Sequence, residues 1–436
     1  MARYTDTTPP QVPQHSVKSQ CIEQTRLYEV ITPLLGGGSK VHTVDSETTV
    51  RVSQIRGMLR FWWRATRGGQ YDTIAKLKRA ESSIWGGSIG KEMVPSAVCI
   101  SMNIENAGNE CISDSDISPT GSSEKLSSQK SKYSYVLFPL REKTEVKLRK
   151  NVVFRLNVIY PESLSQEVEA AFWAWELFGG IGARTRRGLG AISLKEVDGK
   201  KRPLHTTVEL QQHIALHAAT FIDDTYAIEG VPLLKKNIQI GSYEVMKASV
   251  GFTAHDKSAI SVFGKLIARY RSYRQTRHTS EGGSAGQGES IWPDPNALRY
   301  ISGVALRSKN FYATTHHIPR AQLGLPIIST FPNAKFDNRT RKVTFTIQNA
   351  MNRHASPLIF RPHVVEGGYV GIILILGNTR IDYPLDITSD GPFLDRSGTQ
   401  LSPIGEAKIM NPQNEPHGPT NTSDVLAGVF AYMKNA

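Results

Sequence analysis

Residues 53–69 have the sequence SQIRGMLRFWWRATRGG, a pattern that predicts one amphipathic helix. Ser53 is a favourable N-cap residue, and Gly68 can take the left-handed conformation in which many helices end. At about 100° per residue, one side of this helix is apolar and can face a core. The apolar side carries Ile55, Met58, Leu59 and Trp62.

A second side of the predicted helix is strongly basic. It carries four arginines and no lysine, namely Arg56, Arg60, Arg64 and Arg67. Neighbouring like charges at these spacings cost about 0.2 to 0.5 kcal/mol each in an isolated helix, and no acidic residue among them offsets that cost. A phosphate chain would offset it, and the planar guanidinium fork suits phosphate. Trp63, between the two sides, is placed to pack sideways, to stack on a base or to hold a guanidinium. The pattern favours nucleic-acid binding over its alternative, a solvated basic face.

The composition is that of a basic globular protein. The chain has 436 residues, 39% of them hydrophobic, which is enough for two domains with full cores. Lysine and arginine number 52 against 39 acidic residues, so the formal charge of +13 favours a polyanionic partner. Three cysteines without a CxxC pair favour a reducing, cytoplasmic location. The longest apolar run, residues 370–376, is too short to cross a bilayer, so we expect no membrane segment.

A glycine-rich loop precedes the basic helix. It follows a predicted strand at 27–32 and contains Gly36, Gly37 and Gly38, with Lys40 and His42 just beyond them. Glycines allow backbone N–H groups to come close to an anion, and the lysine adds charge. The alternative interpretation is an ordinary flexible turn.

A second glycine-rich loop, residues 180–190, has the sequence GIGARTRRGLG and leads from a predicted helix into a predicted strand. Phosphate loops of nucleotide-binding proteins run from strand to helix, and the Walker type needs a Gly-Lys-Ser/Thr that this loop lacks, so we expect no nucleotide cofactor. Gly182 and Gly188 permit close backbone approach, while the charge for a sugar-phosphate chain comes from Arg184, Arg186 and Arg187. The alternative is a helix C-cap with a basic turn.

The predicted elements of the first half follow the order strand, helix, strand, strand, helix, strand. Strands are expected at 27–32, 96–102, 151–160 and 190–197, and helices at 54–67 and 165–178. This β-α-β-β-α-β order is the ferredoxin-like arrangement of RRM-type RNA-binding domains. Three motifs, TPLLGGG at 32–38, IRGMLRFWWR at 55–64 and GIGARTRRGLG at 180–190, make the sequence similar to the RAMP superfamily of type III CRISPR systems. The resemblance is to the two-domain RAMP subunit one of the type III-B (Cmr) effector complex.

The resemblance implies an α+β protein with two ferredoxin-like β-α-β-β-α-β domains that carry insertions. After a flexible lead-in at 1–20, the first domain would cover residues 21–205 and the second residues 206–436. Polar composition without apolar periodicity predicts a mobile insertion at 103–132 and a mobile loop at 279–290.

The function that the resemblance implies is an RNA-binding subunit of an antiviral CRISPR ribonucleoprotein. It would grip the 3′ region of the guide RNA, or the duplex of guide and target RNA, beside other RAMP subunits of the Cmr complex. Contacts to phosphate and ribose are expected, because a subunit that serves any spacer cannot depend on base identity. The candidate contact residues are Gly36, Gly37, Gly38, Lys40, Arg56, Arg60, Trp63, Arg64, Arg67, Gly182, Arg184, Arg186, Arg187, Gly188 and, from a short pattern of the same family at 353–358, Arg353 and His354.

Two other functions stay open from the sequence. Relatives in the superfamily cut RNA with histidine or with an aspartate and a metal, and the candidates near the motifs are His42, Asp45 and His354. Acid–base cleavage needs a second positioned group and metal-assisted cleavage needs clustered carboxylates, and the sequence shows neither pattern. We therefore expect no catalytic residue, no metal and no cofactor. The other alternative is a scaffold subunit that contacts only proteins.

Overall fold

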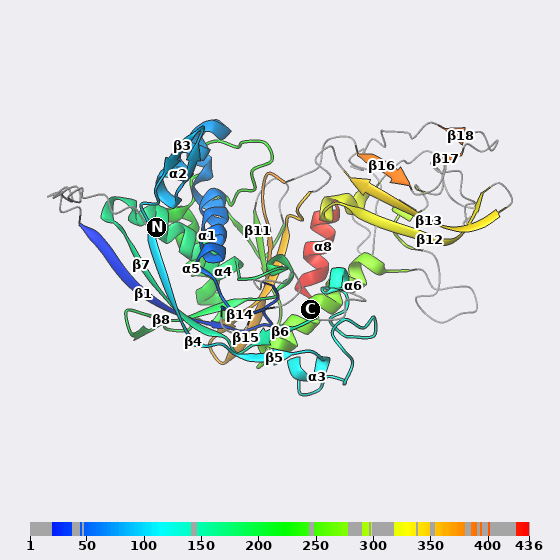
Figure 1. Cartoon of the computed structure of the whole chain (residues 1–436), viewed down its shortest axis with the longest axis horizontal. Coiled ribbons are helices and arrows are strands. Elements are labelled where there is room, and N and C mark those ends of the chain that lie inside the picture. Colours follow the sequence, from blue (N-terminus) through cyan, green and yellow to red (C-terminus); the bar gives the residue numbers. More distant parts are fainter. Residues whose placement is uncertain are drawn as a thin grey trace, which may run out of the picture.

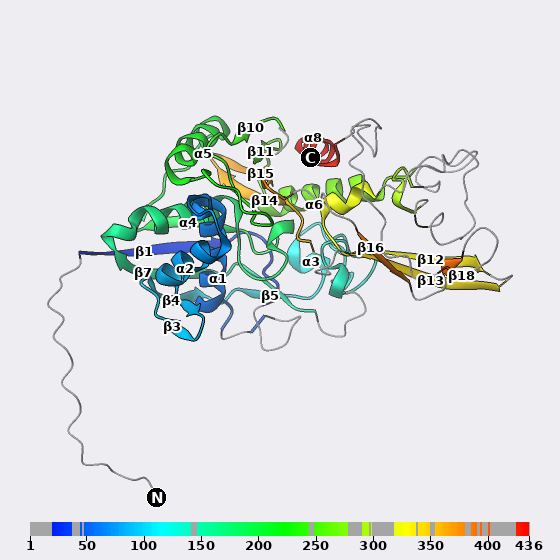
Figure 2. The ribbon, with the colours of Figure 1, turned by 90° about the horizontal axis from the view of Figure 1, so that it is seen from above.

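The computed structural model describes residues 20–36, 44–45, 48–140, 146–243, 248–277, 290–295, 298, 318–336, 339–348, 354–379, 385–389, 393–394, 400–401 and 424–435. In this part of the chain two main sheets lie side by side, and a group of helices packs between them (Figures 1 and 2). The mixed α+β architecture with antiparallel sheets is the one predicted. No helix in the described ranges is both long and apolar enough to cross a membrane.

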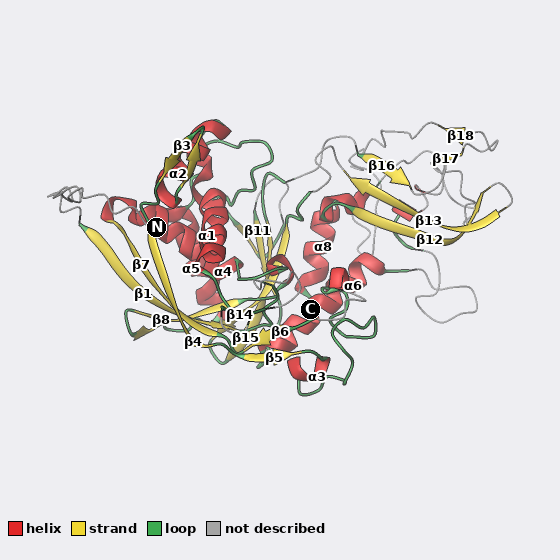
Figure 3. Cartoon of the chain, viewed as in Figure 1, coloured by secondary structure: helices red, strands yellow, loops and turns green. Residues whose placement is uncertain are grey.

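The first sheet is antiparallel throughout and has the strand order β4-β7-β1-β8-β9. Its strands are β1 (Cys21–Val30), β4 (Cys99–Asn106), β7 (Val153–Pro161), β8 (Ile192–Val197) and β9 (Lys200–Lys201). In the central register, Tyr28 lies opposite Phe154 on one side and Leu194 on the other. Alternate residues of β7, such as Phe154 and Leu156, are buried, because one face of the sheet is covered by helices (Figure 3).

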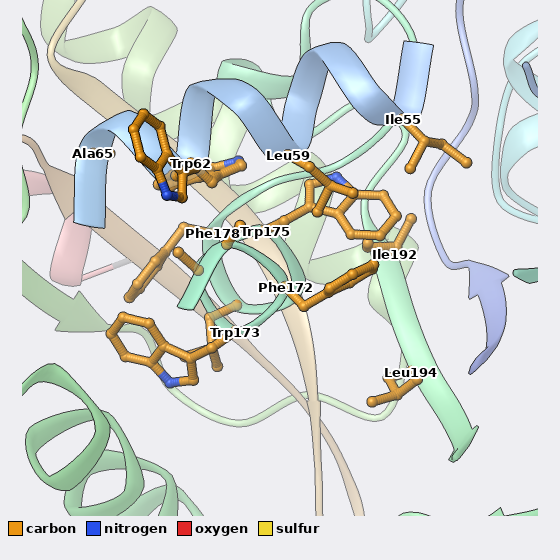
Figure 4. Close-up of a cluster of buried hydrophobic side chains, with 14 of the residues drawn as sticks. Ile55, Leu59, Trp62, Ala65, Phe172, Trp173, Trp175, Phe178, Ile192 and Leu194 are labelled. Atoms are coloured by element: carbon orange, nitrogen blue, oxygen red, sulfur yellow. The ribbon is translucent and has the colours of Figure 1, made fainter. Parts of the chain in front are cut away.

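Two helices cover that face. They are α1 (Val52–Arg67) and α4 (Ser165–Phe178), and their side chains interlock around Trp62, Trp175 and Phe178 (Figure 4). Most residues of helix α4 are buried, as expected for a helix whose apolar residues belong to the core. The predicted order is confirmed for this part of the chain, since the elements run β1, α1, β4, β7, α4, β8. Additional elements lie between them, namely α2 (Ile74–Trp85), β2 (Gly87–Ile89), β3 (Glu92–Val94), β5 (Asn109–Cys111), α3 (Asp114–Ile117) and β6 (Leu148–Lys150).

The predicted end of α1 at Arg67, with Gly68 as the C-cap residue, was confirmed, whereas the predicted N-cap and the predicted conformation of Gly68 were wrong. The N-cap residue is Arg51, and no side chain caps the helix there. Gly68 has a φ of −61°, so it does not stop the helix in a left-handed conformation, and the chain continues into the 3₁₀ turn η1 (Gly68–Gln70). A glycine is needed one residue later for a packing reason. A Cβ on Gly69 would lie 2.1 Å from the carbonyl oxygen of Asp223.

The second sheet has the order β10-β11-β15-β14. Its strands are β10 (Gln239–Ile240), β11 (Ser249–Phe252), β14 (Leu358–Val365) and β15 (Gly368–Ile375), and its helices are α6 (Ala259–Gln275) and α8 (Val425–Lys434). One face packs on α4 through Ile359 and Leu374, and the other packs on α6 and α8 through Phe360 and Ile373. Along the chain, β11, α6, β14, β15 and α8 follow the order strand, helix, strand, strand, helix. Strand β10 pairs in parallel with β11 at the edge of the sheet.

The rest of the described chain adds elements around these two sheets. Helix α5 (Thr207–Phe221) connects the two halves, and a separate sheet contains β12 (Ile327–Phe336), β13 (Arg339–Gln348) and β16 (Asp386–Ser389). A two-stranded pair follows, β17 (Phe393–Leu394) and β18 (Gln400–Leu401). The 3₁₀ turns are η2 (Phe138–Leu140), η3 (Glu162–Leu164), η4 (Thr185–Arg187) and η5 (Pro319–Leu323).

The insertion at 103–132, expected to be mobile, is instead packed against the second half of the chain. Ile117 and Leu126 are buried in one cluster with residues of α6. The Asp114 carboxylate is buried, and it accepts hydrogen bonds from Ser131 Oγ at 2.6 Å and from the Lys132 main-chain nitrogen at 2.8 Å. The few apolar residues follow no strand or helix period, which is why the composition suggested disorder. Residues 1–19 and 279–289, the other segments expected to be mobile, lie outside the described residues.

A buried arginine joins the two sheets. Arg361 of β14 is 1% exposed and donates to the main-chain oxygens of Gly179 at 2.6 Å and Glu176 at 2.9 Å, at the C-terminus of α4. It also donates to the main-chain oxygen of Ile192 in β8. A cation is favourable at a helix C-terminus, because the last carbonyl groups carry partial negative charge. One hydrophobic cluster also crosses the predicted boundary at 205–206, so the two halves are packed as neighbours with a shared core.

Candidate nucleic-acid interface

The two glycine loops lie against each other at one end of the first sheet. The Ala183 main-chain nitrogen donates to Leu35 O at 2.7 Å, and that of Gly190 donates to Pro33 O at 2.9 Å. Thr32 connects them further, since its hydroxyl donates to Gly188 O at 2.7 Å and accepts from the Ala191 main-chain nitrogen at 2.8 Å. Motifs about 150 residues apart in the sequence therefore form one backbone unit.

The glycines of these loops serve packing inside the protein. Gly182 has a φ of +87°, and a Cβ there would lie 2.4 Å from Leu35 O. Gly188 has a φ of +83°, and its Cβ would lie 3.1 Å from the Phe263 ring of α6. Gly36 is also buried. Each of Gly36, Gly182 and Gly188 thus faces another segment of the protein, and their contact with RNA stays a prediction.

The three loop arginines have different surroundings. Arg184 has a left-handed backbone with a φ of +63°, its side chain is exposed, and its guanidinium has no hydrogen bond or ion pair within the described residues. Arg186 is half-buried, donates to the Ser356 main-chain oxygen, and lies over the Phe61 ring of α1, with 5.2 Å between its Cζ and the ring centroid. Burial and the nearby Arg187 lower the pKa of Arg186 to about 10. Arg184 and Arg186 thus remain positive without a carboxylate partner in the described chain.

Arg187 points into the protein. It donates to the main-chain oxygen of Leu358 at 2.8 Å and to the Tyr270 hydroxyl at 2.9 Å. Its Cζ lies 4.4 Å from the centroid of the Tyr270 ring. Burial lowers the pKa of Arg187. Arg187 therefore holds the loop against the second sheet and α6, and its contact with RNA stays a prediction.

The basic side of α1 has internal acidic partners that no pattern within the helix indicates. Glu81 of α2, with 7% of its side chain exposed, accepts from Arg60 Nε at 2.6 Å and also from Arg64 Nη1. Arg67 is buried and pairs with Glu167 of α4 at 2.8 Å. The assumption that only an external polyanion could offset these charges was wrong. Two arginines still share one carboxylate, so that group keeps a net positive charge, and Arg60 and Arg64 are 33% and 34% exposed.

Two other residues of α1 complete this side. Trp63 is 0% exposed, and its Nε1 donates to Glu167 Oε2 at 2.7 Å, so it cannot stack on a base and that prediction was wrong. Arg56 is partly buried, and its buried Nε has no hydrogen-bond partner in the described residues. Arg56 is therefore the α1 arginine with the least internal compensation.

The candidate catalytic residues take part in structural contacts. Asp45 pairs with Arg51 and accepts a hydrogen bond from the Thr48 hydroxyl at 3.1 Å. The His354 ring is half-buried and its Nε2 lies 3.1 Å from Thr379 O; burial lowers the pKa of His354. Among the residues that the structure describes, no group of three or more His, Cys, Asp or Glu side chains could hold a metal ion. The predicted contacts Gly37, Gly38, Lys40 and Arg353, and the candidate His42, lie outside the described residues.

Two residues beside the loops were missed from the sequence. Phe61 provides the ring beneath Arg186. Arg149 pairs through its main chain with Leu34, next to the first glycine loop, at N···O distances of 2.7 and 3.0 Å. The basic run KLRK at 147–150 was a signal for Arg149, whereas nothing in the helix pattern distinguishes Phe61 from a core residue.

Comparison with known proteins agrees with the three motifs. Residues 27–193 match the model of the RAMP superfamily. The chain is 26% identical over 185 residues to the CRISPR system Cmr subunit Cmr1-2 of Pyrococcus furiosus, an alignment that covers 38% of this chain and 92% of that protein.

Two solved structures contain similar chains. Cmr1 from Pyrococcus furiosus in its apo form is 18% identical, with a TM-score of 0.48 over 83% of this chain and 90% of that chain. A chain of the type III-B Cmr-beta complex bound to cognate target RNA is 12% identical, with a TM-score of 0.42 over 94% of this chain and 99% of that chain. The family match contains α1 and both glycine loops, so residues 27–193 of this chain are similar to the RAMP superfamily.

Proposed function

We propose that this chain is an RNA-binding subunit of a type III-B CRISPR ribonucleoprotein, where it holds the sugar-phosphate backbone of the guide RNA near its 3′ end and of its duplex with target RNA. Neighbouring RAMP subunits of the same complex are its protein partners. The superfamily match over 27–193 and the similarity to a Cmr subunit support the assembly. The observation that carries RNA binding is the exposed Arg184, which has no carboxylate partner in the described chain, beside the half-buried Arg186.

The proposed contact surface is smaller than the one predicted from the sequence. It consists of Arg184 and Arg186 on the second glycine loop and of Arg56, Arg60 and Arg64 on α1. The guanidinium of Arg186 lies over the Phe61 ring, and this contact places the second glycine loop beside α1. Guanidinium groups bind phosphate through paired N–H donors, which gives contacts that do not depend on base identity.

Binding to two RNAs of unrelated sequence tests this function. The affinity of the purified chain, and of the chain assembled with its partner subunits, is measured by fluorescence anisotropy for both RNAs. Arg184→Ala should weaken binding to both RNAs by the same factor. Arg155→Ala is a matched control, because Arg155 alternates with the buried Phe154 and Leu156 and so lies on the sheet face away from α1 and α4.

The two alternatives give different results in the same experiment. The proposed subunit performs no cleavage, so both RNAs should stay intact with and without divalent metal. Cleavage that is lost in Asp45→Asn would favour the endoribonuclease. One observation supports the alternative of a scaffold subunit that contacts only proteins, namely the internal pairing of Arg60, Arg64 and Arg67. Unchanged RNA affinity in a folded Arg184→Ala variant would favour the scaffold.

A further inference from the structure

A small cavity of about 50 Å³ lies where α4, β8 and the start of α5 meet β14. It is lined by Trp173, Ser193, Arg202, His205, His213 and His363, among other residues. Trp173 projects from the side of α4 that faces away from α1, so the cavity is separate from the proposed RNA contacts (Figure 4). A single water molecule needs on the order of 10 to 15 Å³, and this cavity therefore has room for a few waters or for one small ion.

Three polar atoms around the cavity are buried without a hydrogen-bond partner among the described residues. They are Trp173 Nε1, Ser193 Oγ and His363 Nδ1. Trp173 is 5% exposed and Ser193 is 3% exposed. Buried polar groups in folded proteins almost always have a hydrogen-bond partner, because a group that loses its hydrogen bonds to water and gains no others destabilises the fold. Three such atoms around one cavity indicate a bound species that supplies the missing partners.

The side chains around this cavity offer hydrogen-bond donors in excess. Trp173 Nε1 can only donate, and the half-buried Arg202 guanidinium, which has no partner within the described ranges, can only donate as well. Among the described residues that line the cavity, Glu176 is the one carboxylate. Its Oε1 already accepts from Arg26 Nη1 at 2.9 Å and from the Tyr28 hydroxyl at 2.6 Å. A ligand with several acceptor oxygens fits this set better than water, which brings as many donors as acceptors.

The charged groups around the cavity also bear on which ligand fits it. Burial lowers the pKa of His363 well below its ordinary value, and Arg361 and Arg202 lower it further. Burial lowers the pKa of His213 to about 3, with contributions from His217 and Arg202. Burial is the larger cause of both shifts, and the Arg202 guanidinium contributes to both, so positive charge near the cavity disfavours another cation there.

We propose that this cavity binds a small oxyanion of the size of phosphate, through Trp173 Nε1, Ser193 Oγ and the Arg202 guanidinium. His363 belongs to β14 of the second sheet and lines the same cavity. A bound oxyanion therefore stabilises the contact of β14 with β8 and α4. Free inorganic phosphate and the terminal phosphate of an RNA chain share this chemistry.

Thermal unfolding of the full chain tests the site. Inorganic phosphate should raise the Tm above that in sodium chloride of equal ionic strength, because a ligand that binds only the folded state stabilises it. Arg202→Met and the milder Ser193→Ala should lose most of this rise. Lys200→Met is the charge-matched control, since Lys200 is exposed on β9 and does not line the cavity, and it should keep the full rise.

A second arm separates the two sources of phosphate. RNAs that end in a 3′-phosphate or a 3′-hydroxyl are compared for affinity to the wild-type chain and to Arg202→Met. Tighter binding of the phosphorylated RNA that disappears in Arg202→Met assigns the site to an RNA terminus, whereas equal affinity with a phosphate-dependent Tm assigns it to the free ion. A Tm that is the same in phosphate and chloride, together with equal RNA affinities, would overturn the proposal and leave a cavity filled by water.

Discussion

Replacing Glu81 by glutamine tests how the basic side of α1 is held in the folded protein. Glu81 Oε1 accepts from Arg60 and from Arg64, which are four residues apart on α1. Glutamine keeps the shape of the side chain and one acceptor oxygen but removes the negative charge. The two guanidinium groups then face each other without an anion.

The expected loss follows from the contacts and the exposure. A hydrogen bond to a charged group contributes about 1.5 to 3 kcal/mol, and like charges four residues apart repel by about 0.2 to 0.5 kcal/mol. Arg60 and Arg64 are 33% and 34% exposed, so water takes over part of the lost interaction. We expect the free energy of unfolding to fall by about 1 to 2 kcal/mol in Glu81→Gln. Arg60→Ala should cost less than about 1 kcal/mol, because Arg64 keeps its partner.

Urea unfolding and RNA binding of the same variant should move in opposite directions. Glu81→Gln frees positive charge, so RNA affinity should rise although the fold becomes less stable. Each added phosphate contact with single-stranded RNA should steepen the salt dependence by about 0.7 in log–log slope. Stability equal to the wild type would refute the shared ion pair. Weaker RNA binding by the folded variant would refute the placement of Arg60 and Arg64 toward RNA.

Three further substitutions test the packing around the site. Gly190→Ala should lower the free energy of unfolding by more than about 2 kcal/mol, since the backbone has a φ of +61° and a Cβ would lie 1.8 Å from Ile181 O; a melting curve equal to the wild type would contradict this geometry. Trp63→Phe should cost about 1.5 to 3 kcal/mol in urea unfolding, by loss of the hydrogen bond to Glu167, with RNA affinity unchanged. In phosphate-free buffer, stability should fall as the pH drops from about 6.5 toward 3, because the unfolded chain takes up a proton that buried His213, with its pKa of about 3, does not. His213→Phe should flatten that decrease, and an unchanged pH profile would show that His213 is not responsible.

The local elements could be predicted from the sequence because their signals are local. The apolar spacing of α1 and α4 indicated both helices, and together with the predicted strands it indicated the order of elements along the first part of the chain. The adjacency of the second loop to α1 followed from that order, and the contact of Arg186 with Phe61 agrees with it.

The partners of charged and polar side chains could not be predicted in the same way. Glu81 and Glu167 come from other helices, so no spacing within α1 indicates that they neutralise its arginines. Residues 103–132 bury single apolar side chains at irregular intervals, which no periodic pattern can indicate. The glycines were recognised as points of close approach, but the sequence does not say that the approaching segment is Leu35 or Phe263.

RNA affinity as a function of salt for Arg184→Ala and Arg155→Ala is the most direct test of phosphate binding at the second glycine loop. Each variant removes a single arginine, and thermal unfolding serves as the check that each variant is folded. Arg184→Ala should weaken binding to unrelated RNAs equally and reduce the salt slope by about 0.7, while Arg155→Ala, whose arginine pairs with Glu105 at 2.6 Å, should leave both unchanged. Equal affinities and equal slopes for the two variants would contradict RNA binding by this loop.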